Sequence, residues 1–370
     1  MKQKTLYFPG LHGLRCIAAL MVIITHVELF KARYGLSNIY HFNKNFGVYG
    51  VDFFFVLSGF LITYLLFKED DKFGFINLKF FYLRRIFRIW PLYYLLIIIV
   101  FLLVPLISYP IVPGYNLTDN YIERLCFFLF FLPNVSKSFF EFIPYGGVMW
   151  SVGVEEQFYL LWPLLLKYSK NYLNTILYSI VFFILIKIVI MIPFFDSFSS
   201  ISKIRTLLAY TRIELMAVGA LGAYALYYKK YTTFILNKYT VNLSVLLMFL
   251  LMFFLPESLN NLIHIFLSLP FIFLIINVAE GRTLVSFESK LLRWLGNISY
   301  GMYMYHMFIA GGIIYLFKDF SESIFLFNII IYMLILGLTV LVSHYSFKFI
   351  ERPFLLLKRK FTIINSGIKN

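Results

Sequence analysis

Long apolar runs alternate along the chain with short breaks that contain charged residues, proline or asparagine. A helix needs about 20 mostly apolar residues to cross the hydrocarbon core of a bilayer. The pattern therefore predicts an all-α integral membrane protein with about ten transmembrane helices. The predicted spans are residues 11–29, 47–67, 86–107, 150–167, 173–193, 206–228, 234–255, 261–279, 294–316 and 325–348.

The composition agrees with a membrane protein. Of the 370 residues, 61% are hydrophobic and 14% charged, and the mean hydropathy is +0.81. Because soluble proteins carry about 25% charged residues, we expect the lipid bilayer as the environment and no nucleic-acid partner. We expect residues 1–353 to form a single multi-helix domain. Residues 354–370 then form a short basic cytoplasmic tail, with no appended soluble domain.

The net charge of +15 is explained by topology. Lysines and arginines concentrate in alternate connections between the predicted spans, and positive charge marks the cytoplasmic side of a membrane protein. This distribution places both termini in the cytoplasm. The only two cysteines, Cys16 and Cys126, lie in apolar stretches, which supports neither a disulfide framework nor a metal site.

The first predicted span carries two ionisable residues, Arg15 and His26. Eleven residues at 100° each bring them within roughly 20° of the same helix face, with a rise of about 16 Å. Ionisable residues inside a membrane span are costly and are candidates for function. A lone helix histidine can also be structural, and His41, His264 and His344 are interpreted in that way.

Two spans that enter from the outer side carry carboxylates. Asp52 is expected at about the depth of His26, where it can orient the imidazole. Ser151, Glu155 and Tyr159 follow at intervals of four residues and share a helix face, and Glu156 lies beside them. A salt bridge or hydrogen-bond network between helices is the structural alternative for this acidic pair.

Two further groups complete the candidate site. Ser299, Tyr303 and His306 form one stripe of the ninth span, which either lines the same cavity or is a polar packing seam. At the inner surface, Arg84, Arg85 and Arg88 are spaced to reach one anion such as a phosphate. Membrane-anchoring positive charge explains these arginines equally well.

Several catalytic classes lack their motifs in this sequence. The histidines do not pair at i and i+4, and neither a glycine-rich phosphate loop nor a G-x-S-x-G elbow occurs. Zinc hydrolysis, nucleotide hydrolysis and serine hydrolysis are therefore disfavoured, and no metal is expected.

Six motifs in order resemble the acyltransferase-3 family of ten-helix membrane acyltransferases, which modify extracytoplasmic glycans. The resemblance covers nearly the whole chain. In one departure, His12 stands where the family often has an acid, so a salt bridge between that position and Arg15 is not expected. The motifs are R-x10-H at Arg15 and His26, FFFVLSGF at 53–60, RRIFRIWP at 84–91, WSVGVEEQFY at 150–159, residues 296–306, and ERPF at 351–354.

The resemblance implies an acyl-CoA donor bound from the cytoplasm, with acetyl-CoA as the expected donor, and a hydroxyl of an extracytoplasmic glycan or glycolipid as acceptor. It also implies a bacterial inner (cytoplasmic) membrane. His26 is the expected general base, oriented by Asp52 or Glu155, and an acyl-histidine intermediate stays open. Arg15, Arg84, Arg85 and Arg88 are expected to hold the CoA phosphates. The expected acceptor-binding residues are Ser151, Glu156, Tyr159, Ser299, Tyr303 and His306.

A transporter or flippase for a glycan or a lipid-linked sugar is the alternative. It accounts for many helices and buried charges, but it would move its substrate without cleaving a thioester. An interaction scaffold explains the helices and leaves the layered arginine, histidine and acidic residues without a purpose.

Overall fold

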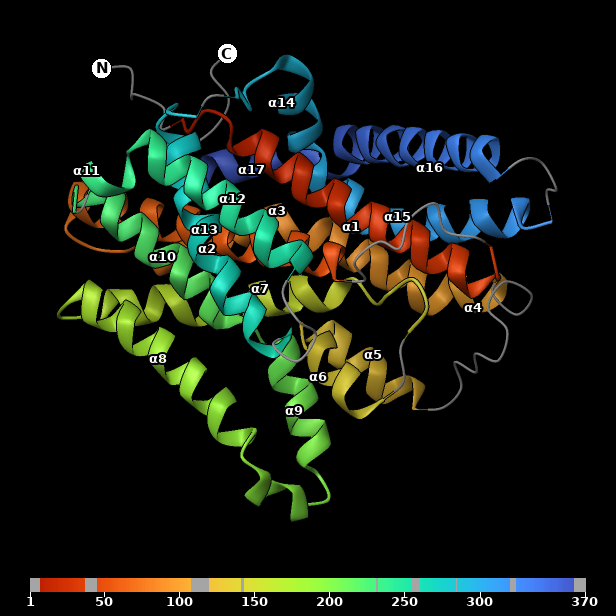
Figure 1. Ribbon diagram of the computed structural model, residues 1–370, viewed down its shortest axis with the longest axis horizontal. Coiled ribbons are helices and arrows are strands. Elements are labelled where there is room, and N and C mark those ends of the chain that lie inside the picture. The colour runs from red at the N-terminus through yellow and green to blue at the C-terminus, as the bar shows by residue number, and fades with distance from the viewer. Residues whose placement is uncertain are drawn as a thin grey trace.

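The computed structural model describes residues 7–36, 45–107, 120–140, 143–230, 232–254, 260–283, 285–319 and 324–362. Every regular element in these ranges is a helix (Figure 1), which confirms the predicted all-α class. Within them, five segments are long and apolar enough to cross a membrane: Leu11–Arg33, Phe46–Phe73, Leu78–Leu106, Tyr172–Ile190 and Phe325–Phe361.

The α-helices are α1 (Leu11–Arg33), α2 (Phe46–Phe73), α3 (Leu78–Ile98), α4 (Val104–Ile107), α5 (Tyr121–Leu129), α6 (Pro133–Phe139), α7 (Met149–Lys167), α8 (Tyr172–Ile190), α9 (Ile201–Tyr210), α10 (Ile213–Tyr227), α11 (Thr232–Ile235), α12 (Lys238–Phe254), α13 (Asn260–Ala279), α14 (Lys290–Asn297), α15 (Ser299–Phe317), α16 (Ile324–Ser346) and α17 (Arg352–Lys358). Short π- or 3₁₀-helical turns cover Ile99–Leu103, Pro193–Ser197, Phe347–Glu351 and Arg359–Phe361.

The structure corrects two of the predicted spans. The run 206–228 is broken between α9 and α10, where Arg212 turns its buried guanidinium toward Asp52 on α2. The run 294–316 is broken at Ile298, between α14 and α15. Apolar composition on both sides of a break hides it from a hydropathy pattern, because the break depends on contacts with other helices. The ten-span count and the cytoplasmic termini stay predictions.

Helix α2 lies at the centre of the bundle and packs against α1, α10 and α13. Its crossing with α10 depends on two glycines. A Cβ at Gly59 would lie 1.9 Å from the carbonyl oxygen of Met216, and one at Gly219 would lie 2.0 Å from that of Val56. Small residues allow helix backbones to approach this closely, as is typical of helix packing in membranes. The close fit fixes the position of α2, which contributes one wall of the site described below.

Helix α8 lies at the edge of the bundle (Figure 1), and almost none of its residues are buried. Its outward side chains are nevertheless apolar, including Leu177, Val181, Phe182 and Leu185. A continuous apolar surface of this kind is unfavourable in water and normal in contact with lipid. The exposed face of α8 therefore supports a membrane environment.

The segment beyond residue 353, which the sequence analysis assigned to a basic tail, remains helical as far as Phe361. Helix α17 packs along α3, and Arg84 on α3 donates a hydrogen bond to the carbonyl oxygen of Phe361 at 3.1 Å. Residues 354–361 therefore belong to the packed helical body.

Candidate active site

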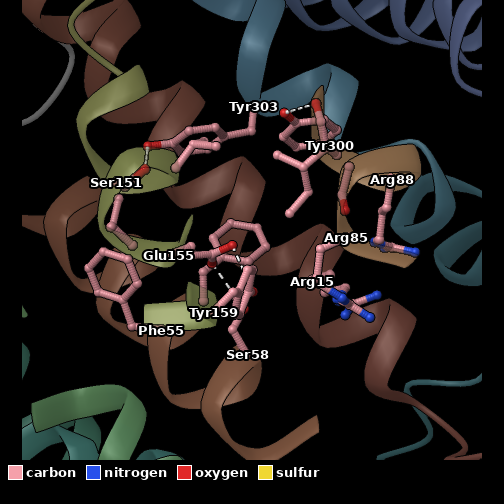
Figure 2. A pocket seen from close by; sticks show the side chains of 15 residues that line it. Arg15, Phe55, Ser58, Arg85, Arg88, Ser151, Glu155, Tyr159, Tyr300 and Tyr303 are labelled. Carbon is pink, nitrogen blue, oxygen red and sulfur yellow. Dashed lines mark hydrogen bonds between the residues drawn. The ribbon is translucent and has the colours of Figure 1, made fainter. Parts of the chain in front are cut away.

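Two cavities meet inside the bundle, between α1, α2, α3 and α7. Both are lined by Arg15, Ser58, Arg85, Arg88 and Tyr159. The first cavity extends from this junction toward α7 and α15 (Figure 2), and its further lining residues are Val51, Phe54, Phe55, Ile89, Ser151, Val152, Glu155, Ser299, Tyr300 and Tyr303.

Three guanidinium groups gather at the junction, Arg15 from α1 and Arg85 and Arg88 from α3 (Figure 2). None of them makes a hydrogen bond or a salt bridge with the residues that the structure describes, and the Nε of Arg85 is buried without a partner. Arg85 lies over the ring of Tyr159 at 5.6 Å. Like charges gathered in this way need a counter-anion, so the junction is suited to a phosphate-bearing ligand.

Arg84 does not join this group, contrary to the expectation from its i,i+4 spacing to Arg88. Its guanidinium forms a salt bridge with Glu69 on α2 at 2.7 Å. The second oxygen of Glu69 accepts a hydrogen bond from the backbone N–H of Asn77 at 2.8 Å. The charge of Arg84 is therefore neutralised within the protein. Its guanidinium connects α3 with Glu69 on α2 and with the carbonyl oxygen of Phe361.

Hydrogen-bonded hydroxyls and one carboxylate form the wall opposite the arginines (Figure 2). The carboxylate of Glu155 accepts hydrogen bonds from Ser58 at 2.9 Å and Tyr159 at 3.0 Å. The hydroxyls of Ser151 and Tyr303 lie 2.7 Å apart. These groups join α2, α7 and α15, so the i,i+4 series on α7 does face the cavity.

Two residues expected to bind the acceptor are placed differently from each other. Ser299 lines the cavity, and its hydroxyl donates to the carbonyl oxygen of Gly296 at 2.8 Å. Glu156 is not part of the cavity wall. Its carboxylate instead accepts a hydrogen bond from the indole of Trp90 at 3.0 Å.

His26 on α1 pairs with His306 on α15. The Nδ1 of His26 lies 2.9 Å from the carbonyl oxygen of Val22 and 3.1 Å from the Nε2 of His306. The Nδ1 of His306 lies 2.7 Å from the carbonyl oxygen of Tyr303. Because a carbonyl only accepts, both Nδ1 atoms carry the proton, which leaves the Nε2 of His26 with its lone pair.

Neither Asp52 nor Glu155 contacts His26, so the expectation that one of them orients this imidazole is corrected. Asp52 is fully buried, forms a salt bridge with Arg212, and lies 2.6 Å from the Nδ1 of His264. His264 therefore has polar partners, Asp52 and Arg212, that the sequence did not reveal. His41 lies outside the described residues.

Sequence reasoning missed the His26–His306 pair and the Arg212 partner of Asp52. Both depend on contacts between helices that are far apart in the sequence. Spacing within one helix therefore gives no signal for either contact. Within the described residues, no three His, Cys, Asp or Glu side chains gather as metal ligands would.

Neither His26 nor His306 is among the residues that line the two cavities. A helical membrane protein with an internal cavity lined by arginines, hydroxyls and one carboxylate is suited to bind an anionic ligand. The chain belongs to the acyltransferase-3 family. It matches the family's sequence profile, described as "Acyltransferase domain", over residues 8–346. The predicted family is thereby confirmed.

Curated relatives have related names. The chain is 28% identical to "Putative O-acetyltransferase SACOL0978" of Staphylococcus aureus (strain COL), over 95% of this chain and 58% of the relative. It is 29% identical to "Peptidoglycan O-acetyltransferase OatA" of Listeria monocytogenes, over 94% and 56%. It therefore spans a little over half the length of these relatives. No solved structure matches the chain.

Proposed function

We propose that this protein is a membrane O-acyltransferase of the bacterial inner membrane. It moves an acyl group, acetyl by analogy with the relatives, from acyl-CoA to a hydroxyl of an extracytoplasmic glycan or glycolipid. Peptidoglycan is the first acceptor to test because a relative is named for it. The observation that carries the proposal is the group Arg15, Arg85 and Arg88 where two cavities meet, which makes no salt bridge with the described residues.

The arginine group suits the donor. CoA carries several phosphate charges on a long, flexible arm, and guanidinium groups bind phosphates through paired hydrogen bonds. With the phosphates at the junction, the acyl end of the arm extends into the first cavity toward Ser151 and Tyr303. In the proposed orientation the junction is reached from the cytoplasm, which is supported by Tyr7 and Lys358, near the two described ends of the chain, lining the adjoining cavity.

The histidine pair suits the chemistry. The Nε2 of His26 takes the proton of the acceptor hydroxyl while the hydroxyl oxygen attacks the thioester carbonyl carbon. A carbon–oxygen bond forms, the carbon–sulfur bond breaks, and the proton is passed to the departing CoA thiolate. The carbonyl oxygen of Val22 holds the tautomer of His26 that this step requires, and the Nε2 of His306 accepts from the same N–H group.

Tyr303 connects the histidine pair with the first cavity. Its ring lines the cavity, and its carbonyl oxygen accepts the Nδ1 proton of His306. Its hydroxyl and that of Ser151 can stabilise the developing negative charge on the thioester oxygen or position the acceptor.

The test is release of free CoA from acetyl-CoA by the purified protein in detergent, with peptidoglycan fragments as acceptor. We expect acceptor-dependent release that falls by about 10²- to 10⁴-fold in His26→Ala, the contribution typical of a general base. His344→Ala is the matched control, because His344 lies on α16 and packs against Trp294 and Tyr345 and not against the His26–His306 pair, and it should keep wild-type activity.

Two outcomes would change the mechanism or the class. Labelled acetyl trapped on the protein without acceptor, and lost in His26→Ala, would show an acyl-histidine intermediate. Movement of a lipid-linked glycan across vesicles without any thioester cleavage would instead support the transporter.

A further inference from the structure

The second cavity leads away from the arginine group on the side opposite Ser151 and Tyr303. Apolar residues, basic side chains and a few hydroxyls line it, and no carboxylate lines it within the part of the chain that the structure describes. The residues that line this cavity and not the first are Tyr7, Phe8, Leu11, His12, Leu61, Ile62, Leu65 and Lys358.

Lys358 adds a fourth basic side chain to the wall that Arg15, Arg85 and Arg88 share. It comes from α17, whose packing on α3 brings it there. Its ammonium group makes no salt bridge or hydrogen bond with the described residues. Glu69 lines a small neighbouring cavity together with Lys358, but its two oxygens are taken by Arg84 and Asn77. The sequence predicts Arg84 as a member of this basic group, and in the structure Lys358 lines the cavity in its stead.

Two side chains of the N-terminal segment complete the wall. The Nδ1 of His12 is buried without a hydrogen-bond partner, so a polar group there is still to be satisfied. Tyr7 donates to Glu288, and burial and that carboxylate raise its pKa to about 12. The phenol therefore stays neutral, and it brings no negative charge into the cavity.

The order of these groups follows the order of groups in CoA. The arginines line both cavities, whereas Lys358 and His12 line the second cavity and not the first. If the thioester lies in the first cavity and the pyrophosphate at the arginines, the part of CoA beyond the pyrophosphate lies in the second cavity. That part is the adenosine with its 3′-phosphate, and a phosphate there would be the missing counter-ion of Lys358.

We propose that Lys358 binds the 3′-phosphate of the donor, with His12 on the same wall, and so selects CoA over donors that lack this phosphate. This inference rests on the proposed function. It adds a specificity-determining residue contributed by α17, beyond the arginines at the junction.

The experiment compares the dissociation constants of CoA and 3′-dephospho-CoA for the purified full chain, measured by isothermal titration calorimetry. We expect the wild type to bind CoA at least about tenfold more tightly, as a charge-assisted hydrogen bond provides. Lys358→Met should reduce this preference to less than about twofold by weakening CoA binding alone. Lys360→Met, an exposed lysine two residues along, should keep the wild-type preference.

Equal affinities of the wild type for the two ligands would overturn the inference without any variant. So would an unchanged preference in Lys358→Met, or an equal loss of both affinities. Because the experiment measures binding and not transfer, it is independent of the CoA-release assay. A protein that prefers CoA over 3′-dephospho-CoA but never cleaves acetyl-CoA would refute the proposed function and keep the binding site.

Discussion

Two groups of buried charges lie in this helical bundle, and they are built in opposite ways. In the first group, which we call the paired cluster, every charged side chain has an opposite partner within the protein. Asp52 bonds to Arg212 and to His264, and Lys187 forms a salt bridge with Glu214. Such a group needs no ligand, because the protein itself supplies the compensation for burying its charges.

The second group, the unpaired cluster, consists of Arg15, Arg85, Arg88 and Lys358. It has no ion pair within the described residues, and it borders on open cavities. The sequence marks members of both clusters as functional candidates, Asp52 in the paired cluster and Arg15, Arg85 and Arg88 in the unpaired cluster. The difference in pairing separates them: the paired cluster holds helices together, and the unpaired cluster is completed by an anion.

Breaking the paired cluster should have the largest effect. Asp52→Ala leaves the buried guanidinium of Arg212 without its carboxylate, which typically costs about 3–5 kcal/mol. We expect a large drop in the thermal unfolding midpoint of the purified protein in detergent, or loss of folded protein. Asp52→Asn, which keeps hydrogen-bond acceptor capacity, should lose less. An unfolding midpoint equal to that of the wild type in Asp52→Ala would contradict the assignment.

Removing a cation from the unpaired cluster should act on binding and not on folding. Arg85→Met relieves repulsion from Arg15 and Arg88, so the unfolding midpoint should stay the same or rise. The free energy of CoA binding should become less favourable by about 1.5–3 kcal/mol, the contribution of a hydrogen bond to a charged group. The measurements are calorimetric titration with CoA and thermal unfolding.

Arg84→Met is the matched control for this variant, one residue away on the same helix. It leaves Glu69 without its partner, so it should lower the unfolding midpoint while CoA affinity changes little. The reverse result, with Arg84 needed for CoA binding and Arg85 needed for stability, would show that Arg84 binds the ligand and Arg85 has the structural role.

A change in ionic strength should affect the two clusters differently, with smaller effects than the substitutions above. Added salt screens accessible charges more than buried ones. Raising salt from about 50 to 500 mM should therefore weaken CoA binding several-fold. It should hardly change the difference in unfolding midpoint between wild type and Asp52→Asn, because Asp52 is fully buried. Salt-independent CoA affinity would argue against phosphate recognition by the arginines.

The sequence predicts well what depends on spacing within one helix. The turn-by-turn series Ser151, Glu155 and Tyr159 does face one cavity, and Arg85 and Arg88 do meet. The helical class follows from apolar runs for the same reason, since composition and period are local properties.

Prediction failed where the partner comes from another helix. Spacing placed Arg84 with Arg88, but Glu69 on α2 removes it from the site. Depth placed Asp52 near His26, but Arg212, at a break that hydropathy does not reveal, pairs with it. Lys358 was assigned to a tail, because only the packing of α17 on α3 brings it to the cavity. Each error concerns which helices touch, and one sequence without tertiary contacts does not contain that information.

We propose that the unpaired cluster is a binding site for a polyanion such as CoA. Its most direct test is the thermal unfolding midpoint of the wild type and of Arg85→Met, each with and without CoA. A ligand that binds only the folded state raises its stability. The account predicts that CoA raises the midpoint of the wild type, and that Arg85→Met starts at or above the wild-type value and hardly responds. A wild type that saturating CoA leaves unchanged, together with a lower midpoint for Arg85→Met, would contradict it.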